Sequence, residues 1–287
     1  EAQYDATASS PTEWVFAYEV QSGDLDGDGL AFAGSTPLEL NGATIQDAAG
    51  NAADLSVATL PDISGIKVDA AAPAMTSVTI APGTYLAGDT LSLTVNYDEP
   101  VIVTGGVPKL PLTIGSQTVE AAYASGTGSA ALVFAYTLEA NLEDADGIQL
   151  AAAVLPGTAE VKDAAGNEAS YAVSTPLHLT DVLVDTVVPS VQTVAMIDGV
   201  YRTGNELAIT VTYSEAVEVD TVNGSPFIAF HIGGTGYQAS YASGSGTPVL
   251  KFLYTVAAND GNGESLDLSG AAAIELNGGT LKDASGN

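Results

Sequence analysis

Short stretches in which hydrophobic and polar residues alternate run along most of the chain, whereas helical periodicity is almost absent. Residues 91–97 (LSLTVNY) place their leucines, valine and tyrosine on one face of a predicted strand, and residues 207–213 (LAITVTY) repeat the pattern. Further strands are predicted at residues 77–80, 101–104, 110–114, 118–123, 131–138, 148–153, 159–162 and within 171–184.

Turn-forming residues separate the predicted strands, as at Pro82-Gly83, Gly105-Gly106 and residues 125–128 (SGTG). Strands at this close spacing, with turns between them, predict an all-β fold made of immunoglobulin-like β-sandwiches. The Cys-Trp-Cys signature of antibody domains is missing. Trp14 has no tryptophan counterpart elsewhere in the chain, which indicates a local packing role.

The sequence repeats itself with a period of about 116–120 residues, so the sandwiches are expected to form an elongated tandem array. Val68-Asp69 returns as Val184-Asp185, and an Asp-Ala-Ala/Ser-Gly-Asn motif ends at Asn51, Asn167 and Asn287. The frame of the repeat opens and closes inside units, which predicts a window of a longer array. The predicted divisions are 1–69 (C-terminal part of an incomplete repeat), 70–185 (a complete repeat) and 186–287 (a repeat lacking its last strand).

Composition narrows the possible partners. The 287 residues are 46% hydrophobic, too many for a disordered chain, and 35 acidic residues against six basic ones give a net charge of −29. Nucleic acid and anionic membrane surfaces are excluded as partners because both need Lys/Arg patches. No apolar run approaches the roughly 18 residues that a membrane span needs. Such an acidic surface recruits cations, and Ca²⁺, which prefers oxygen ligands, is the expected cofactor.

One set of candidate ligands lies in short acidic loops. Carboxylates at alternate positions with glycine between them let a loop curl around one Ca²⁺. The pattern resembles the first half of an EF-hand loop, without flanking helices or a closing glutamate. A solvated acidic turn is the alternative interpretation. The candidates are Asp24, Asp26 and Asp28 in the first copy, Asp144 and Asp146 in the second, and Asp260, Asn262 and Glu264 in the third.

A second set of carboxylates is dispersed in sequence. If strands follow sandwich order, alternate loops lie at the same pole, so Asp69, Glu99 and Asp163 are expected to converge where two repeats join. Three carboxylates without a cation would raise one another's pKa, and a bound Ca²⁺ removes that cost. The aspartates of the repeated motif have an alternative role in forming their own turns. The corresponding residues are Asp185, Glu215 and Asp283 in the third repeat and Asp47 in the first copy of the motif.

These motifs carry a resemblance that extends over essentially the whole chain. The units resemble the tandem immunoglobulin/cadherin-like repeats of giant bacterial surface proteins, including large secreted adhesins and repeats associated with cyanobacterial swimming. The resemblance implies extracellular, calcium-stiffened spacers whose immediate partners are neighbouring repeats of the same chain. Ala70-Ala71-Ala72 departs from the usual polar linker. The matching segments are 184–189 (VDTVVP), 199–201 (GVY), 213–217 (YSEAV), 241–247 (YASGSGT), 250–254 (LKFLY) and 278–287 (GGTLKDASGN).

Catalysis finds little support. The two histidines, His178 and His231, occupy non-equivalent positions, and no catalytic triad or phosphate-binding loop stands out. No cysteine is present, which excludes disulfides, thiolate zinc sites and cysteine nucleophiles. Two alternatives to the spacer stay open. The array itself can self-associate into a filament, sheath or surface layer, or the tyrosines Tyr18, Tyr136 and Tyr254, which otherwise fill the core, can stack on sugars in a carbohydrate-binding module.

Overall fold

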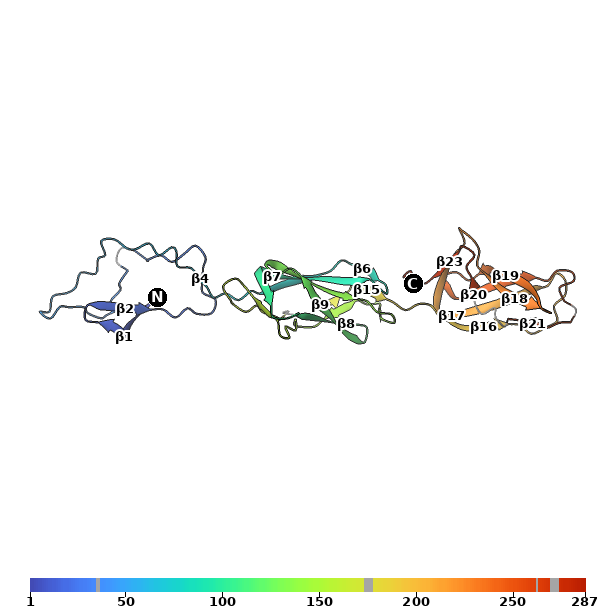
Figure 1. The fold of residues 1–287 in the computed structure, drawn as a ribbon, viewed down its shortest axis with the longest axis horizontal. Helices are drawn as coiled ribbons and strands as arrows, with labels where there is room; N and C mark the ends of the chain where they lie inside the picture. Colours follow the sequence, from blue (N-terminus) through green and yellow to red (C-terminus); the bar gives the residue numbers. More distant parts are fainter. Residues whose placement is uncertain (35–36, 173–177, 262, 269–273) are drawn as a thin grey trace.

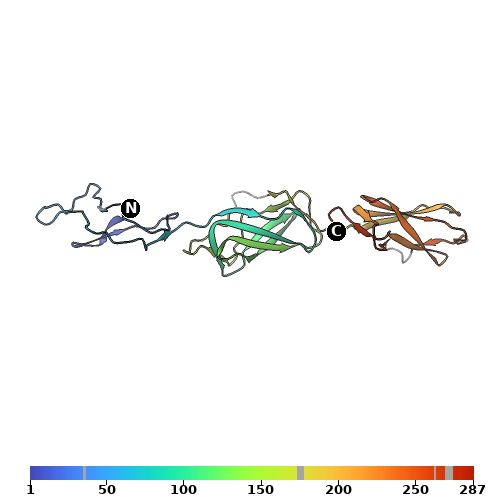
Figure 2. The ribbon, with the colours of Figure 1, turned by 90° about the horizontal axis from the view of Figure 1, so that it is seen from above.

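The computed structural model describes residues 1–34, 37–172, 178–261, 263–268 and 274–287, and these ranges contain strands and connecting segments but no helix. The prediction of an all-β protein is therefore confirmed. Figures 1 and 2 show the chain drawn out along one long axis, with three groups of elements in line. We refer to them as the N-terminal segment (residues 1–69), the middle unit (70–185) and the C-terminal unit (186–287). In the described ranges, no helix is long and apolar enough to cross a membrane.

The N-terminal segment has little regular structure. Strands β1 (Gln3–Ser10) and β2 (Glu13–Ala17) form an antiparallel hairpin, and β3 (Leu25–Asp26) pairs with β4 (Val68–Asp69). None of the described side chains in this segment is buried. The segment therefore has strands but no hydrophobic core.

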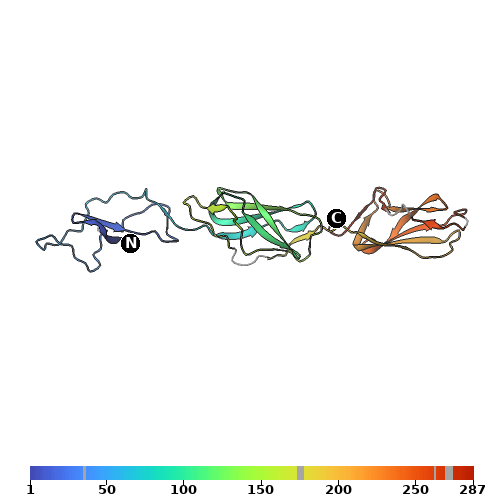
Figure 3. The same ribbon diagram turned by 60° about the horizontal axis from the view of Figure 1, so that its bottom comes forward.

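The middle unit is β-sandwich-like. One sheet runs in the order β13-β7-β10-β9-β8-β12-β14, with β5 also paired to β7, and a small second sheet has the order β11-β15-β6. Figure 3 shows the strands of this unit from a third direction. The strands are β5 (Met75–Thr79), β6 (Gly83–Tyr85), β7 (Thr90–Thr104), β8 (Lys109–Ile114), β9 (Gln117–Ser125), β10 (Ser129–Thr137), β11 (Glu143–Asp144), β12 (Ile148–Leu150), β13 (Glu160–Lys162), β14 (His178–Leu179) and β15 (Val182–Asp185).

The C-terminal unit repeats the order of the larger sheet. Its path β16-β17-β20-β19-β18-β21 corresponds to β5-β7-β10-β9-β8-β12, and β23 pairs with β17 as β13 pairs with β7. A further strand, β22, pairs with β18. The strands are β16 (Val191–Met196), β17 (Glu206–Asp220), β18 (Phe227–Ile232), β19 (Thr235–Ser243), β20 (Thr247–Thr255), β21 (Leu266–Asp267), β22 (Ile274–Glu275) and β23 (Thr280–Lys282).

The alternating pattern of the sequence builds two separate cores. In β7, Leu91, Leu93 and Val95 are fully buried, and Leu207, Ile209 and Val211 of β17 are buried in the same way. The residues between them lie on the opposite face, because successive side chains of a strand point to opposite faces. Each unit therefore holds a core of its own.

An aromatic pair recurs in three hairpins. Tyrosine stands opposite phenylalanine in the pairs Tyr4↔Phe16, Tyr123↔Phe134 and Tyr241↔Phe252, with ring centroids 5.9, 6.0 and 5.9 Å apart. Only the environment differs: Phe134 and Phe252 are at most 1% exposed, whereas Phe16 is 40% exposed. The repeat seen in the sequence is thus a repeat of local structure, with burial in two of the three copies.

The largest difference from the predicted strands is in β7. Residues 91–97 and 101–104 were expected to be two strands joined by a loop, but β7 is continuous over Thr90–Thr104. It pairs with β10 and β5 through its first half and with β13 through residues 102–104, and its register to β10 shifts near Ser129. A strand that passes from one set of neighbours to another must bend, so the acidic and proline residues at 98–100 mark a bend within the strand rather than its end.

Candidate functional site

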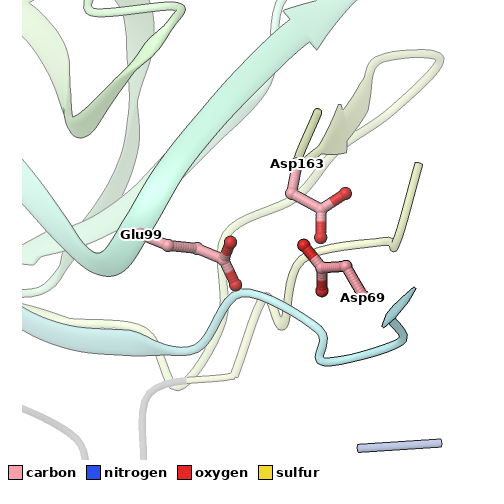
Figure 4. A group of neighbouring side chains, drawn as sticks. All are labelled: Asp69, Glu99 and Asp163. Carbon is pink, nitrogen blue, oxygen red and sulfur yellow. The ribbon is translucent and has the colours of Figure 1, made fainter. Parts of the chain in front are cut away.

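Three carboxylates meet where the N-terminal segment enters the middle unit. One oxygen each of Asp69, Glu99 and Asp163 lies within 4.8 Å of the others, so the group could hold a metal ion. Figure 4 shows Glu99 reaching from β7 towards the carboxylates of Asp69 and Asp163. The three residues come from β4, from the bend of β7 and from the turn after β13.

A second group with the same composition lies where the middle unit enters the C-terminal unit. One oxygen each of Asp185, Glu215 and Asp283 again lies within 4.8 Å of the others. Asp283 is buried, and the other two side chains are partly buried. Among the described residues, these two groups are the ones in which three potential ligand side chains come this close.

The aspartate between the units belongs to both of them. The backbone of Asp185 ends β15 and pairs with Glu143 of the middle unit, while its carboxylate joins Glu215 and Asp283 of the C-terminal unit. Asp69 repeats this arrangement, because its backbone pairs with Leu25 of the N-terminal segment. We call Asp69 and Asp185 the bridging aspartates. A cation held at either group would connect two neighbouring parts of the chain.

The residue after each bridging aspartate fixes the backbone further. Thr186 is 1% exposed and exchanges hydrogen bonds with Leu142, its N–H donating to the Leu142 carbonyl at 2.9 Å and its Oγ1 accepting from the Leu142 N–H at 2.7 Å. Ala70 makes a comparable backbone pair with Asp24, at 2.8 Å, but lacks the hydroxyl. The backbone that leaves the middle unit after Asp185 therefore makes more hydrogen bonds to its own unit than the backbone that leaves the N-terminal segment after Asp69.

The motif aspartates shape their own turns. Asp163 Oδ1 accepts hydrogen bonds from the N–H groups of Gly166 (2.6 Å) and Asn167 (2.8 Å). Asp283 Oδ1 accepts from Gly286 (2.7 Å) and Asn287 (2.9 Å). The turn-forming role left open by the sequence is therefore present, and it presents the same carboxylates to the two groups.

The glutamates of the two groups resist ionisation. Burial raises the pKa of Glu99, and the Asp163 and Asp69 carboxylates raise it further. The pKa of Glu215 is raised in the same way, by burial first and then by Asp283, Asp185 and also Glu143 of the middle unit. Burial opposes the ionisation of Asp163 and Asp283, but the hydrogen bonds from their asparagine and turn N–H groups outweigh it and lower their pKa.

Removing the charge of Glu99 is expected to stabilise the metal-free chain. A raised folded-state pKa means that Glu99 favours folding below its ordinary pKa of 4.5 and disfavours it as the pH rises through the folded-state value. Glu99→Gln should therefore raise the thermal midpoint of the middle unit in chelator at pH 7 by about 2 °C, a typical size for partly exposed charges. The gain should vanish once the pH falls below 4.5, because Glu99 is then protonated in both the folded and the unfolded parent protein.

The control is Glu139→Gln, which removes the same charge from an exposed position of the middle unit, just after β10. It changes the net charge equally but leaves both groups intact. If both substitutions raise the midpoint by the same amount, the effect is one of net charge, and local repulsion at Glu99 is contradicted.

The acidic loops are arranged differently. Asp26 Oδ1 accepts from the Gly29 N–H at 2.9 Å, and buried Asp144 accepts from Gly115 (2.7 Å) and Gly147 (2.8 Å). Asp24 and Asp260 each accept a tyrosine hydroxyl and a backbone N–H. These carboxylates hold turns and strand ends together. Asp28, Asp146 and Glu264 are exposed, none of the loops is among the three-carboxylate groups of the described residues, and Asn262 lies outside those residues.

Asp47 has the motif without the group. Its Oδ1 accepts from Ala49 and Asn51 at 2.9 Å and its Oδ2 from the Asn51 side chain at 2.8 Å, as in the other two copies. Among the described residues, Asp47 belongs to neither three-carboxylate group. Asp47 is therefore a natural comparison for the aspartates that do join a group.

Sequence reasoning missed several residues of these sites. The asparagines that end the motif, Asn167 and Asn287, contact the bridging aspartates, and Glu143 lies beside the second group through its pairing with Asp185. The asparagines had a signal, since each copy of the motif ends in Gly-Asn. Glu143 stood out only as an acidic residue of the second loop, and nothing placed it beside the second group, because Leu25 occupies the corresponding position beside Asp69.

Among the described residues, neither histidine belongs to one of the two three-carboxylate groups. His178 Nε2 lies 2.9 Å from the Gly147 carbonyl, and His231 is exposed in β18.

The chain matches no protein-family model and no curated protein sequence.

Proposed function

We propose that this chain is a spacer segment of a large extracellular bacterial protein, in which Ca²⁺ stiffens the connections between immunoglobulin-like repeats. The observation that carries the proposal is the double attachment of the bridging aspartates. Asp185 is strand-paired to one unit and offers its carboxylate to the next, and Asp69 does the same. A cation bound there would link adjacent units directly.

The ligand set favours calcium among the common cations. All the side chains of the groups are carboxylates, and Ca²⁺ binds six to eight oxygens in flexible geometry. Zinc prefers nitrogen and sulfur ligands, which both groups lack, and Mg²⁺ demands a smaller octahedral cage. The net charge of −29 further raises the local concentration of cations.

A mechanical role explains why the arrangement recurs. Stiffening a chain of units requires the same device at each connection, whereas a catalytic site is needed once. The cation stabilises the assembled connection because it binds that state and not the separated one. Extracellular calcium-binding modules work with dissociation constants of about 10⁻⁴–10⁻³ M, which suits partly exposed sites of this kind.

Calorimetric titration of the metal-free chain with CaCl₂ tests the proposal. We expect two saturable sites, with Glu215→Gln weakening the site at the C-terminal unit at least tenfold, since it removes one charged ligand. Among the described residues, the Glu215 side chain is not part of a turn-forming hydrogen bond, so its substitution tests the loss of a ligand rather than the loss of a turn. Asp283→Asn should weaken the same site.

Asp47→Asn is the matched control, because it alters the same motif where no group is formed. It should leave both sites unchanged. Absence of saturable binding in the parent chain, or an equal loss of binding in Asp47→Asn, would contradict the proposal.

A further inference from the structure

The asparagine that ends each motif reaches across to the linker. Asn167 Nδ2 donates to Asp163 Oδ2 at 2.7 Å within its own turn, and to the backbone carbonyl and Oδ1 of Asp69 at 3.1 and 3.3 Å. The contact with Asp69 joins residues that are 98 positions apart in sequence. One side-chain amide thus ties the end of the preceding strand to the turn of the following unit.

The same contact occurs at the second linker. Asn287 Nδ2 donates to Asp283 Oδ2 at 2.9 Å and to the carbonyl of Asp185 at 3.0 Å. Asn51, in the first copy, makes the bond to its own aspartate, Asp47, and no bond to a linker among the described residues. The bond within the motif is therefore separable from the bond to the linker.

The chemistry of the amide suits this position. A neutral NH₂ group can donate to a carboxylate and a carbonyl at once, without the desolvation that a lysine or arginine would require. It also holds the carbonyl of the bridging aspartate, which fixes the backbone from which that carboxylate projects. A donor placed between oxygen atoms reduces their mutual repulsion when no cation is bound.

We propose that Asn167 and Asn287 are positioning residues that latch each linker onto the following unit without a cation and hold the bridging aspartate ready for one. The latch itself is a property of the metal-free protein and does not depend on the proposed function. The second half of the inference, that the latch orients the bridging aspartate for a cation, rests on the proposed function. The latch makes the carboxylate group partly preorganised. Partners that orient ligands in this way typically change metal affinity by 10–100-fold when they are removed.

Distance measurements between spin labels test the latch in the full chain. The sequence has no cysteine, so Thr118→Cys and Ser240→Cys introduce a unique label pair at exposed positions of β9 and β19, one in each unit. In EGTA, Asn287→Ala should broaden the distance distribution relative to the parent. Asn287→Asp, which keeps the size but replaces the donor by an acceptor, should broaden it at least as much.

Asn51→Ala is the control, since it removes the same motif bond but no linker bond, and it should leave the distribution unchanged. Circular dichroism establishes that each variant keeps its strands. An unchanged distribution for Asn287→Ala in EGTA overturns the latch, and so does equal broadening in Asn51→Ala.

Calcium titration of the same variants tests the second half. Asn287→Ala should weaken the second site about tenfold and leave the first site unchanged. Normal affinity in Asn287→Ala would overturn the preorganisation. If the parent chain binds no calcium at all, the proposed function fails, but the comparison of distance distributions in EGTA still decides the latch.

Discussion

Chelating calcium should loosen the connection between the middle and C-terminal units, which the Asn287 latch then holds without a cation. Without a cation, the carboxylates of Asp185, Glu215 and Asp283, which lie within 4.8 Å of one another, repel, and separation of the units relieves that repulsion. Small-angle X-ray scattering of the full chain should therefore show a maximum dimension that shortens and a distance distribution that broadens when EGTA replaces calcium. Protease cleavage near residues 186–190, between the cores, should accelerate in parallel.

A variant that combines Asp185→Asn, Glu215→Gln and Asp283→Asn provides the control. It should resist the effect of calcium at this connection and show similar scattering in both buffers, apart from the contribution of the first group. Scattering and cleavage of the parent chain that do not change with EGTA would mean that protein contacts alone stiffen the connection. The carboxylates would then have no part in metal binding, and the filament or carbohydrate-binding alternatives would gain support.

The fold could be predicted from the sequence wherever burial follows a simple alternation. Leu91, Leu93 and Val95 read as one face of a strand, and that face is buried. The short strands β6 and β11 could not be recognised in this way, because each has two or three residues and exists through pairing with β15. Pairing between distant segments, such as Thr84 with Leu183, leaves no periodic signal in either one.

The two carboxylate groups were accessible to prediction for a topological reason. Loops at the same pole of a sandwich meet regardless of their local conformation, so Asp69, Glu99 and Asp163 could be brought together even though Glu99 lies in a bent strand rather than in a loop. The acidic loops depended on local geometry instead. In those loops, the sequence pattern of alternating carboxylates does not reveal that the Asp144 carboxylate already accepts hydrogen bonds from the N–H groups of Gly115 and Gly147.

The second large effect that we expect is on the free energy of unfolding, and it follows from the different burial of the phenylalanines in the recurring hairpins. Phe134→Ala should destabilise the middle unit by about 3–5 kcal/mol, because it leaves a cavity at a side chain that is 1% exposed. Phe16→Ala should cost less than about 1 kcal/mol, since Phe16 is 40% exposed and its loss opens no cavity. Both phenylalanines stand opposite a tyrosine in a hairpin, so the substitutions differ in burial rather than in local chemistry.

Hydrogen exchange followed by mass spectrometry is the appropriate measurement, because the single tryptophan, Trp14, lies in the N-terminal segment and does not report on either core. Phe134→Ala should accelerate exchange in β7, β9 and β10 by about 100-fold or more, at about 1.4 kcal/mol per factor of ten. Exchange in β17, β19 and β20 should stay unchanged, since their core is separate, and Phe252→Ala should give the reverse pattern. Acceleration in both units after either substitution would show that the cores unfold together, so the connection would transmit stability as well as orientation.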